Sequence, residues 1–204
     1  MSSRTRVAVV PCAPALLPRY AGLRDPFPDL RAACLAAVRW LVADRRDPVL
    51  VLCPATAPAT CGETGAQQRG LLLAGHLLAA SGHTAGLEHV TLPGAAPVPD
   101  LEGRAVLALA DGSARRGEQA PGYLDDRAFD FDAGVGGALR TGDVAALRDI
   151  DAGLGADLLA EGAPVLRGLA ARVAGVHAVE VDYDGDPYGV QYWVVRWSCS
   201  GRPD

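Results

Sequence analysis

Lysine is absent from this sequence: all 19 basic residues are arginines, and they are set against 24 acidic residues. Without lysine, the chain has neither a Schiff-base lysine nor the lysine of a phosphate-binding loop. The net charge of -5 gives no electrostatic basis for binding nucleic acid or an anionic membrane surface. We therefore expect no nucleic-acid partner and no membrane partner, whereas a small molecule stays open as a partner.

Long hydrophobic runs and paired cysteines are lacking as well. In residues 1–18, Pro11, Pro14 and Pro18 interrupt the apolar run, which is too short for a signal-peptide core or a membrane span. The five cysteines are scattered, and no two of them form a CxxC pair. This pattern is typical of a reducing compartment, so we expect a cytoplasmic protein.

The hydrophobic patterning predicts one layered domain over residues 1–204. Apolar runs predict buried strands at 6–10, 49–53 and 105–110, with a short strand at 88–92. Helical spacing predicts helices at 30–44, 67–80, 129–140, 143–149 and 153–173, the last interrupted near Gly162. Alternating segments at 176–184 and 190–197 predict a C-terminal hairpin. We expect an α/β fold: a three-layer α/β/α domain with a mixed, mainly parallel central sheet and a C-terminal β-hairpin.

Three stretches of the chain carry a family resemblance. They are VAVVPCAPALLPRYAG (7–22), ALADGSARRGEQAPGYLDDRAFDFD (108–132) and YDGDPYGVQYWVVRW (183–197). In this order they resemble the opening strand and loop, the Gly-Asp-Gly-Ser-Ala and Ala-Pro-Gly-Tyr-Leu-Asp stretch, and the closing strand of the class III extradiol dioxygenase β-subunit-like family, in an actinobacterial branch. The resemblance spans nearly the whole chain. It implies a three-layer α/β/α fold with a mixed sheet, which Memo-type proteins share.

The same resemblance implies an Fe(II) cofactor held by two histidines and one carboxylate, with the other face of the metal open to substrate and dioxygen. Cys12 stands where the first histidine is expected, and the stretch 53–56, near the second position, has no imidazole. The family's carboxylate would correspond to Glu161 or Asp157. The scaffold resemblance therefore comes without the family's iron ligands.

The cysteines leave two interpretations open. Cys12 and Cys53 both follow or end predicted strands, and in open α/β sheets this edge carries the ligand crevice. With Cys61 on the next loop or with Glu161, their thiolates would suit zinc or cuprous copper better than ferrous iron. Alternatively, Cys12 and Cys53 are small buried hydrophobic residues, which is the commoner role of free cysteine.

The segment DGSARRG provides the other candidate ligand-binding residues. Asp111 and Gly112 follow a predicted strand, Ser113 offers a hydroxyl, and Arg115 or Arg116 is suited to clamp a carboxylate or phosphate. The same residues would otherwise form a tight turn with solvated arginines.

Two tyrosines, Tyr123 and Tyr188, are further candidates for the crevice. Each offers a ring for packing and a phenol for a hydrogen bond. The alternative is that they anchor their loops onto the core.

These observations predict a non-canonical extradiol dioxygenase-like protein that lacks the ferrous site and binds a small anionic ligand or has an accessory role. One alternative is a ring-cleaving, metal-dependent oxidoreductase with relocated ligands. Another is an interaction platform without catalysis, in which Tyr192, Trp193 and Trp197 would be candidates for an exposed patch. Whether the protein is an enzyme or a pseudoenzyme stays open.

Overall fold

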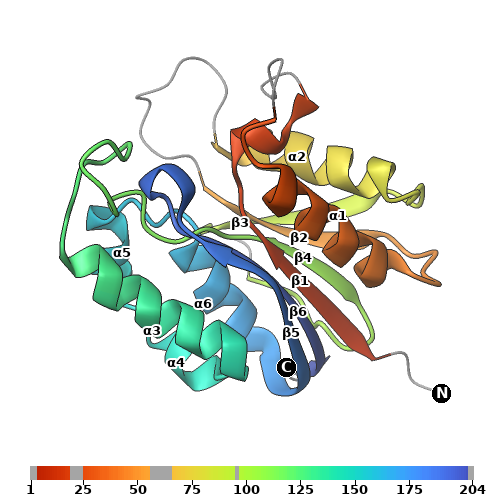
Figure 1. The fold of residues 1–204 in the computed structure, drawn as a ribbon. Helices are drawn as coiled ribbons and strands as arrows, with labels where there is room; N and C mark the ends of the chain where they lie inside the picture. The colour runs from red at the N-terminus through yellow and green to blue at the C-terminus, as the bar shows by residue number, and fades with distance from the viewer. Residues whose placement is uncertain (1–3, 19–24, 56–65, 95–96, 202–204) are drawn as a thin grey trace.

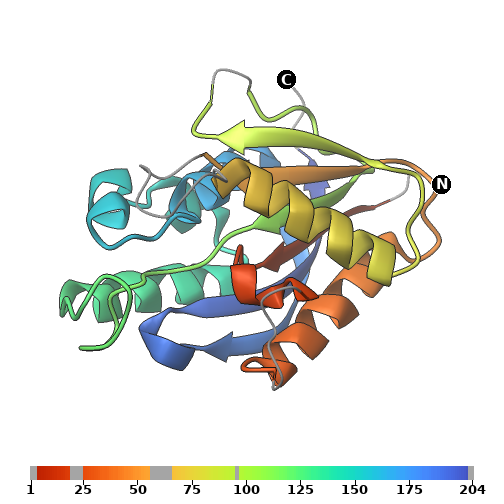
Figure 2. The same ribbon diagram turned by 90° about the horizontal axis from the view of Figure 1, so that it is seen from above.

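The chain folds around a central sheet that is covered by helices on both faces (Figures 1 and 2). The computed structural model describes residues 4–18, 25–55, 66–94 and 97–201. Within these ranges the sheet has six strands in the order β3-β2-β4-β1-β6-β5. The strands are β1 (Thr5–Val10), β2 (Val49–Pro54), β3 (Leu87–Leu92), β4 (Ala105–Leu109), β5 (Val173–Gly185) and β6 (Tyr192–Gly201).

The sheet is mixed and mainly parallel, as the sequence predicts. Strands β3, β2, β4 and β1 run parallel to one another, whereas β6 is antiparallel to both β1 and β5. The long β5–β6 hairpin confirms the predicted C-terminal strand pair. No helix in the described ranges is long and apolar enough to cross a membrane.

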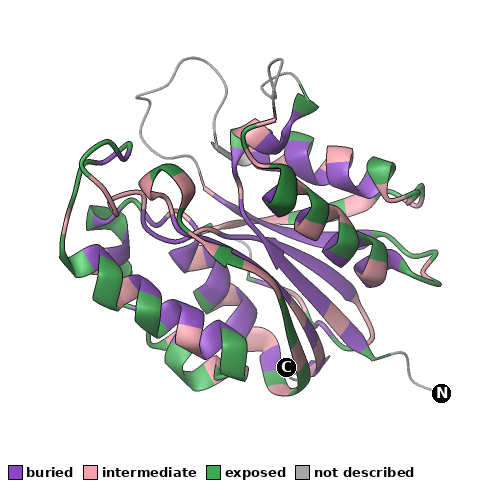
Figure 3. Cartoon of the chain, in the orientation of Figure 1, coloured by how far each residue is buried: buried purple, intermediate pink, exposed green. Residues whose placement is uncertain are grey.

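Two helical layers bury the two faces of the sheet. The first consists of α1 (Pro28–Val42) and α2 (Ala66–Ala80). The second consists of α3 (Arg127–Thr141), α4 (Val144–Arg148), α5 (Ala152–Asp157) and α6 (Ala163–Arg172). Figure 3 shows the buried residues gathered on the sheet and on the helix faces that meet it. Because β1, β2 and β4 are covered on both sides, their continuous apolar runs are buried along their whole length.

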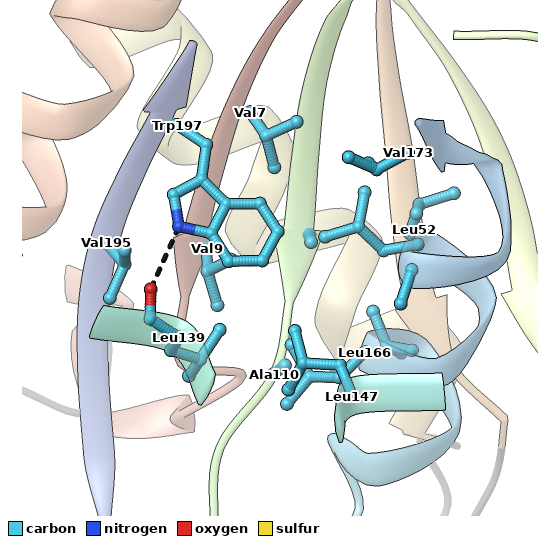
Figure 4. Packing of buried hydrophobic residues seen from close by; sticks show 14 of the residues in the cluster. Val7, Val9, Leu52, Ala110, Leu139, Leu147, Leu166, Val173, Val195 and Trp197 are labelled. Atoms are coloured by element: carbon cyan, nitrogen blue, oxygen red, sulfur yellow. Dashed lines mark hydrogen bonds between the residues drawn. The ribbon is translucent and has the colours of Figure 1, made fainter. Parts of the chain in front are cut away.

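Alternate residues of each central strand point into different cores. Ala8 and Val10 pack in the core under α1 and α2, whereas Val7 and Val9 pack in the core under α3 to α6. Trp197 of β6 is fully buried in the second core, and its indole Nε1 donates a 3.0 Å hydrogen bond to the carbonyl of Leu139 in α3 (Figure 4). This bond ties the longest helix of the second layer to the sheet.

Several element boundaries differ from the sequence prediction. Helix α1 begins at Pro28, with Phe27 as the residue before it, rather than behind Asp29, because proline fits the first helical turn. The interruption expected near Gly162 within 153–173 is confirmed, because this stretch forms two helices, α5 and α6, with the break at residues 158–162. Asp143 and Asp151 cap α4 and α5 by accepting backbone N–H bonds, so short polar caps divide this layer into pieces.

Candidate functional site

The carboxyl ends of the central strands meet at one edge of the sheet and bring three predicted residues there. Cys12 follows β1, Cys53 lies at the end of β2, and Asp111 follows β4. Strand β4 lies between β1 and β2, so the two cysteines do not come from neighbouring strands, and Asp111 comes from the strand between them. We call the group formed by Cys12, Asp111 and Glu161 the crevice.

Glu161 reaches this edge because Gly162 packs directly on the backbone of Asp111. A Cβ atom placed on Gly162 would lie 2.5 Å from the carbonyl oxygen of Asp111 and even closer to its nitrogen. Only glycine permits this approach, although its backbone conformation is ordinary and helical. The break between α5 and α6 therefore places a carboxylate beside the end of β4.

The crevice carboxyl groups are harder to ionise than exposed ones. Burial, followed by the nearby Glu161 carboxylate, raises the pKa of Asp111 to about 7, although backbone N–H groups of Asp111 and Cys12 donate to it. Burial also raises the pKa of Glu161, and the charge of Arg69 opposes that shift. Near neutral pH, Asp111 is therefore a proton donor for part of the population, and Glu161 is a second carboxyl group beside it whose pKa is also raised.

Cys12 is a thiol in this environment. Burial raises its pKa well above the ordinary value, and the charges of Asp111 and Glu161 act in the same direction. Arg69 opposes the shift without reversing it. Because the thiolate is the nucleophile and the metal ligand, Cys12 is poorly suited to either role at neutral pH.

Cys53 belongs to the hydrophobic core. It is fully buried, and burial raises its pKa to about 11. Gly70 of α2 lies over both thiols: a Cβ atom at Gly70 would be 3.5 Å from the Cys12 sulfur and 3.6 Å from the Cys53 Cβ. The structure thus favours the interpretation of Cys53 as a small hydrophobic residue.

The donor set does not fit the ferrous group that the family resemblance implies. All four histidines lie in the described ranges: His76 in α2, His83 after that helix, His89 in β3 and His177 in β5. None is among the residues whose charges act on Cys12 or Asp111. Among the described residues no three cysteine, histidine or carboxylate side chains form a metal-binding group, and Cys61 lies outside them.

The segment that follows Asp111 is held internally rather than presented to a ligand. Ser113 is fully buried; its hydroxyl donates to the Leu158 carbonyl at 2.9 Å and accepts from the Arg115 N–H at 3.0 Å. The Ala114 N–H donates to the same Leu158 carbonyl. These bonds fix Leu158 and with it the turn that leads to Glu161. Ser113 therefore contributes to the crevice indirectly, by holding this turn in place.

The two arginines of this segment differ in how they are paired. Arg116 bonds to buried Asp132 at 3.3 Å and to Asp186 at 2.9 Å, so its charge is compensated, which argues against an anion clamp at Arg116. Arg115 lies 4.0 Å from Asp125, which Arg127 already bonds, and its buried Nε has no hydrogen-bond partner among the described residues, so Arg115 stays a candidate ligand contact.

The crevice itself contains two acids, and the positive charge of Arg69, which acts on Glu161 and Cys12, opposes theirs. Where a ligand bonds directly to Glu161, an uncharged or cationic group suits that carboxyl group better than an anionic one.

Asp132 is a buried acid that contacts the segment after Asp111, although it is not among the site residues that the sequence predicts. Its carboxylate accepts the Ser113 N–H at 2.9 Å, and burial raises its pKa to about 6 against the opposing effects of that bond and of Arg116. The sequence offered one signal for this residue: helical spacing places an acid on the face of the helix that is otherwise apolar and buried.

The tyrosines lie on the surface. Tyr123 is 74% exposed and Tyr188 is 70% exposed, and the Tyr188 ring packs edge-on against Phe27. The hairpin aromatics show the opposite behaviour, because Trp193 and Trp197 are buried in the core and do not form an exposed patch.

An apolar cavity of about 360 Å³ adjoins the crevice at Glu161. Its walls come from the ends of β2 and β3, from α5 and from the start of α6. No local sequence pattern predicts it, because its walls are distant in the chain.

A scan against family models gives no match, and no curated protein matches the sequence at a significant level.

Proposed function

We propose that this protein binds a small molecule in the crevice without a metal ion, on a scaffold similar to the class III extradiol dioxygenase β-subunit. The observation that supports the proposal is the meeting of Asp111, Glu161 and Cys12 at the carboxyl edge of a parallel sheet. In open α/β sheets this edge is where ligands bind. The position that would carry the first iron-binding histidine is Cys12, a thiol with a raised pKa.

Two neighbouring carboxyl groups give the crevice both a hydrogen-bond donor and acceptors. Burial raises the pKa of Asp111 to about 7 and also raises the pKa of Glu161, so a protonated carboxyl group offers an O–H and an ionised one accepts a hydrogen bond. A ligand with a hydroxyl or an amine satisfies both groups. The same pair is suited to move a proton on a bound ligand, which is the chemistry of general acid–base catalysis.

The metal-free part of the proposal is tested by loading untagged protein with Fe(II) under anaerobic conditions, desalting it and measuring iron. We expect far less than one iron per chain and no cleavage of catechol. The crevice residues include no histidine, and no metal-binding group of three side chains is found among the described residues. Stoichiometric iron after desalting would refute the proposal.

The ligand part is tested by a ligand-observed NMR screen of small uncharged, cationic and anionic compounds. We expect hits to be mainly uncharged or cationic and to bind about tenfold more weakly to Asp111→Asn and Glu161→Gln, the loss of one charge-assisted hydrogen bond. Glu118→Gln, at an exposed acid, is the control and should bind as the wild type does. Hits that are indifferent to both crevice substitutions contradict the proposed site.

A further inference from the structure

Among the residues that the structure describes, the apolar cavity beside the crevice has a single charged residue in its lining. Ala55 and Leu92 supply one wall, and Ala152, Ala156 and Leu159 supply another. Glu161 is the only polar side chain of this described lining. Its volume of about 360 Å³ lies within the range of small-molecule sites. A cavity of this composition binds an apolar body and orients it through one polar contact.

Several backbone groups along the cavity walls are already satisfied. The Ala55 N–H donates to the Leu92 carbonyl at 2.7 Å, and the Ala160 N–H donates to the Gly155 carbonyl at 2.8 Å. These groups do not need water, which favours displacement of solvent by an apolar ligand there.

The wall is also fixed in place by the crevice segment. Ser113 and Ala114 both donate to the carbonyl of Leu158. Leu158 directly precedes Leu159 in the chain and lies in the same turn as Glu161. Leu159 itself has a left-handed backbone, with φ of 56°, and its side chain lies against Gly122. Packing therefore holds the cavity and the crevice in one arrangement, with Glu161 at their junction.

We propose that this cavity receives the apolar body of the ligand, and that the ligand is an uncharged or cationic small molecule whose hydroxyl or amine bonds to Glu161. The inference rests on the proposed function and names the class of ligand for it. An anionic group bonded to Glu161 is disfavoured because, among the described lining residues, the only charged side chain is that carboxylate, and Arg69, whose charge acts on Glu161, is not one of them.

Three probes with one apolar body test the charge preference: cyclohexanol, cyclohexylamine and cyclohexanecarboxylate. We expect the alcohol and the amine to shift the methyl NMR signals of Ala152 and Leu159, and the carboxylate to bind at least about tenfold more weakly. Glu161→Gln should remove most of this discrimination, with the alcohol still bound but about tenfold more weakly than to the wild type. Equal affinity of the three probes for the wild type would overturn the inference.

A filling substitution tests the place of binding. Ala156 lies on the exposed side of α5 and lines the cavity, so Ala156→Trp should block binding of the alcohol without disturbing the core. Ala171→Trp, at an exposed position of α6 outside the lining, is the matched control and should bind the alcohol normally. Undiminished binding to Ala156→Trp would refute the cavity as the site.

The two proposals fail in different ways. If Ala156→Trp blocks the alcohol and Asp111→Asn does not, the cavity is supported and the role of Asp111 in the crevice is refuted. If Asp111→Asn weakens binding and Ala156→Trp does not, the crevice is supported and the cavity is refuted.

Discussion

At the scale of single residues, the unusual feature is Asp111, an acid whose neighbours favour its protonated form. It is half-buried at the end of a central strand, and both the Glu161 carboxylate and the Cys12 thiol lie close enough to interact with its charge. Two backbone N–H donors are not enough to offset the loss of hydration. Such a group costs stability whenever it is ionised in the folded protein.

The stability of the protein should therefore depend on pH through Asp111. The pKa of Asp111 rises from 3.8 to about 7 on folding. Its contribution to the stability of the folded protein is therefore fully present below the unfolded pKa and is lost as pH rises towards 7. Between pH 4 and pH 8, we expect the free energy of unfolding of the wild type to fall by roughly 2 kcal/mol relative to that of Asp111→Asn, a value discounted for partial exposure. Urea denaturation of both proteins across this range measures the difference.

Asp125 should affect stability with the opposite dependence on pH. The side-chain hydrogen bond from Arg127 holds the pKa of Asp125 below its ordinary value. The contribution of Asp125 to stability is therefore present above that ordinary value and is lost as pH falls. If the difference in unfolding free energy between the wild type and Asp111→Asn does not change from pH 4 to pH 8, Asp111 ionises with its ordinary pKa and the prediction is wrong.

At the scale of elements, the turn between α5 and α6 decides the geometry of the site. Leu158 accepts hydrogen bonds from the segment after β4, Leu159 lines the cavity, and Glu161 lies near Asp111. Gly162 makes the arrangement possible by lying against the Asp111 backbone. The close approach of two backbones, rather than a catalytic motif, thus joins the second helical layer to the strand edge.

Gly162→Ala should destabilise the protein and displace Glu161. The glycine has helical φ and ψ, which alanine adopts readily, so the cost is the clash of its methyl group with Asp111. We expect about 1–3 kcal/mol lower unfolding free energy, as for other overpacked sites. Thermal or chemical unfolding measures this.

Gly134→Ala is the matched control, because Gly134 lies in α3 with open space around it. There the substitution should stabilise the protein by about 0.5–1 kcal/mol. Equal effects of the two substitutions would mean that Gly162 is not sterically confined.

Prediction of the elements from sequence succeeded where the signal was local. The apolar runs of β1, β2 and β4, the alternation of the final hairpin and the interruption near Gly162 all have structural counterparts. Boundaries were less accurate, because α1 starts at a proline and β5 extends beyond its alternating centre. Local propensity does not specify where tertiary packing ends an element.

At the scale of the whole molecule, the six strands form one continuous sheet, and the two cores share it. Strand β1 pairs with β4 on one side and with β6 on the other, so the C-terminal hairpin completes the sheet begun by the N-terminal strand. Trp193 and Trp197 of β6 are buried against the second helical layer. Neither core has a sheet of its own, and the single domain over residues 1–204 stays a prediction that unfolding experiments can test.

The described fold should unfold in one cooperative transition. Tryptophan fluorescence, to which Trp40 contributes along with buried Trp193 and Trp197, and far-ultraviolet circular dichroism should give the same midpoint in urea, because loss of the sheet removes both cores together. Calorimetric and van't Hoff enthalpies should also agree. A fluorescence transition that precedes the loss of secondary structure would indicate two separable units.

The sequence by itself determined the strands, the layered α/β class and the presence of a thiol rather than an imidazole at Cys12, since all of these are local properties of residue type and spacing. Only the tertiary structure decided that Glu161 meets Asp111, that Arg116 is neutralised by Asp132 and Asp186, and that an apolar cavity adjoins the pair. The reason is physical: ionisation and ligand preference depend on burial and on the charges within a few ångströms. Folding brings those charges together from segments far apart in the chain.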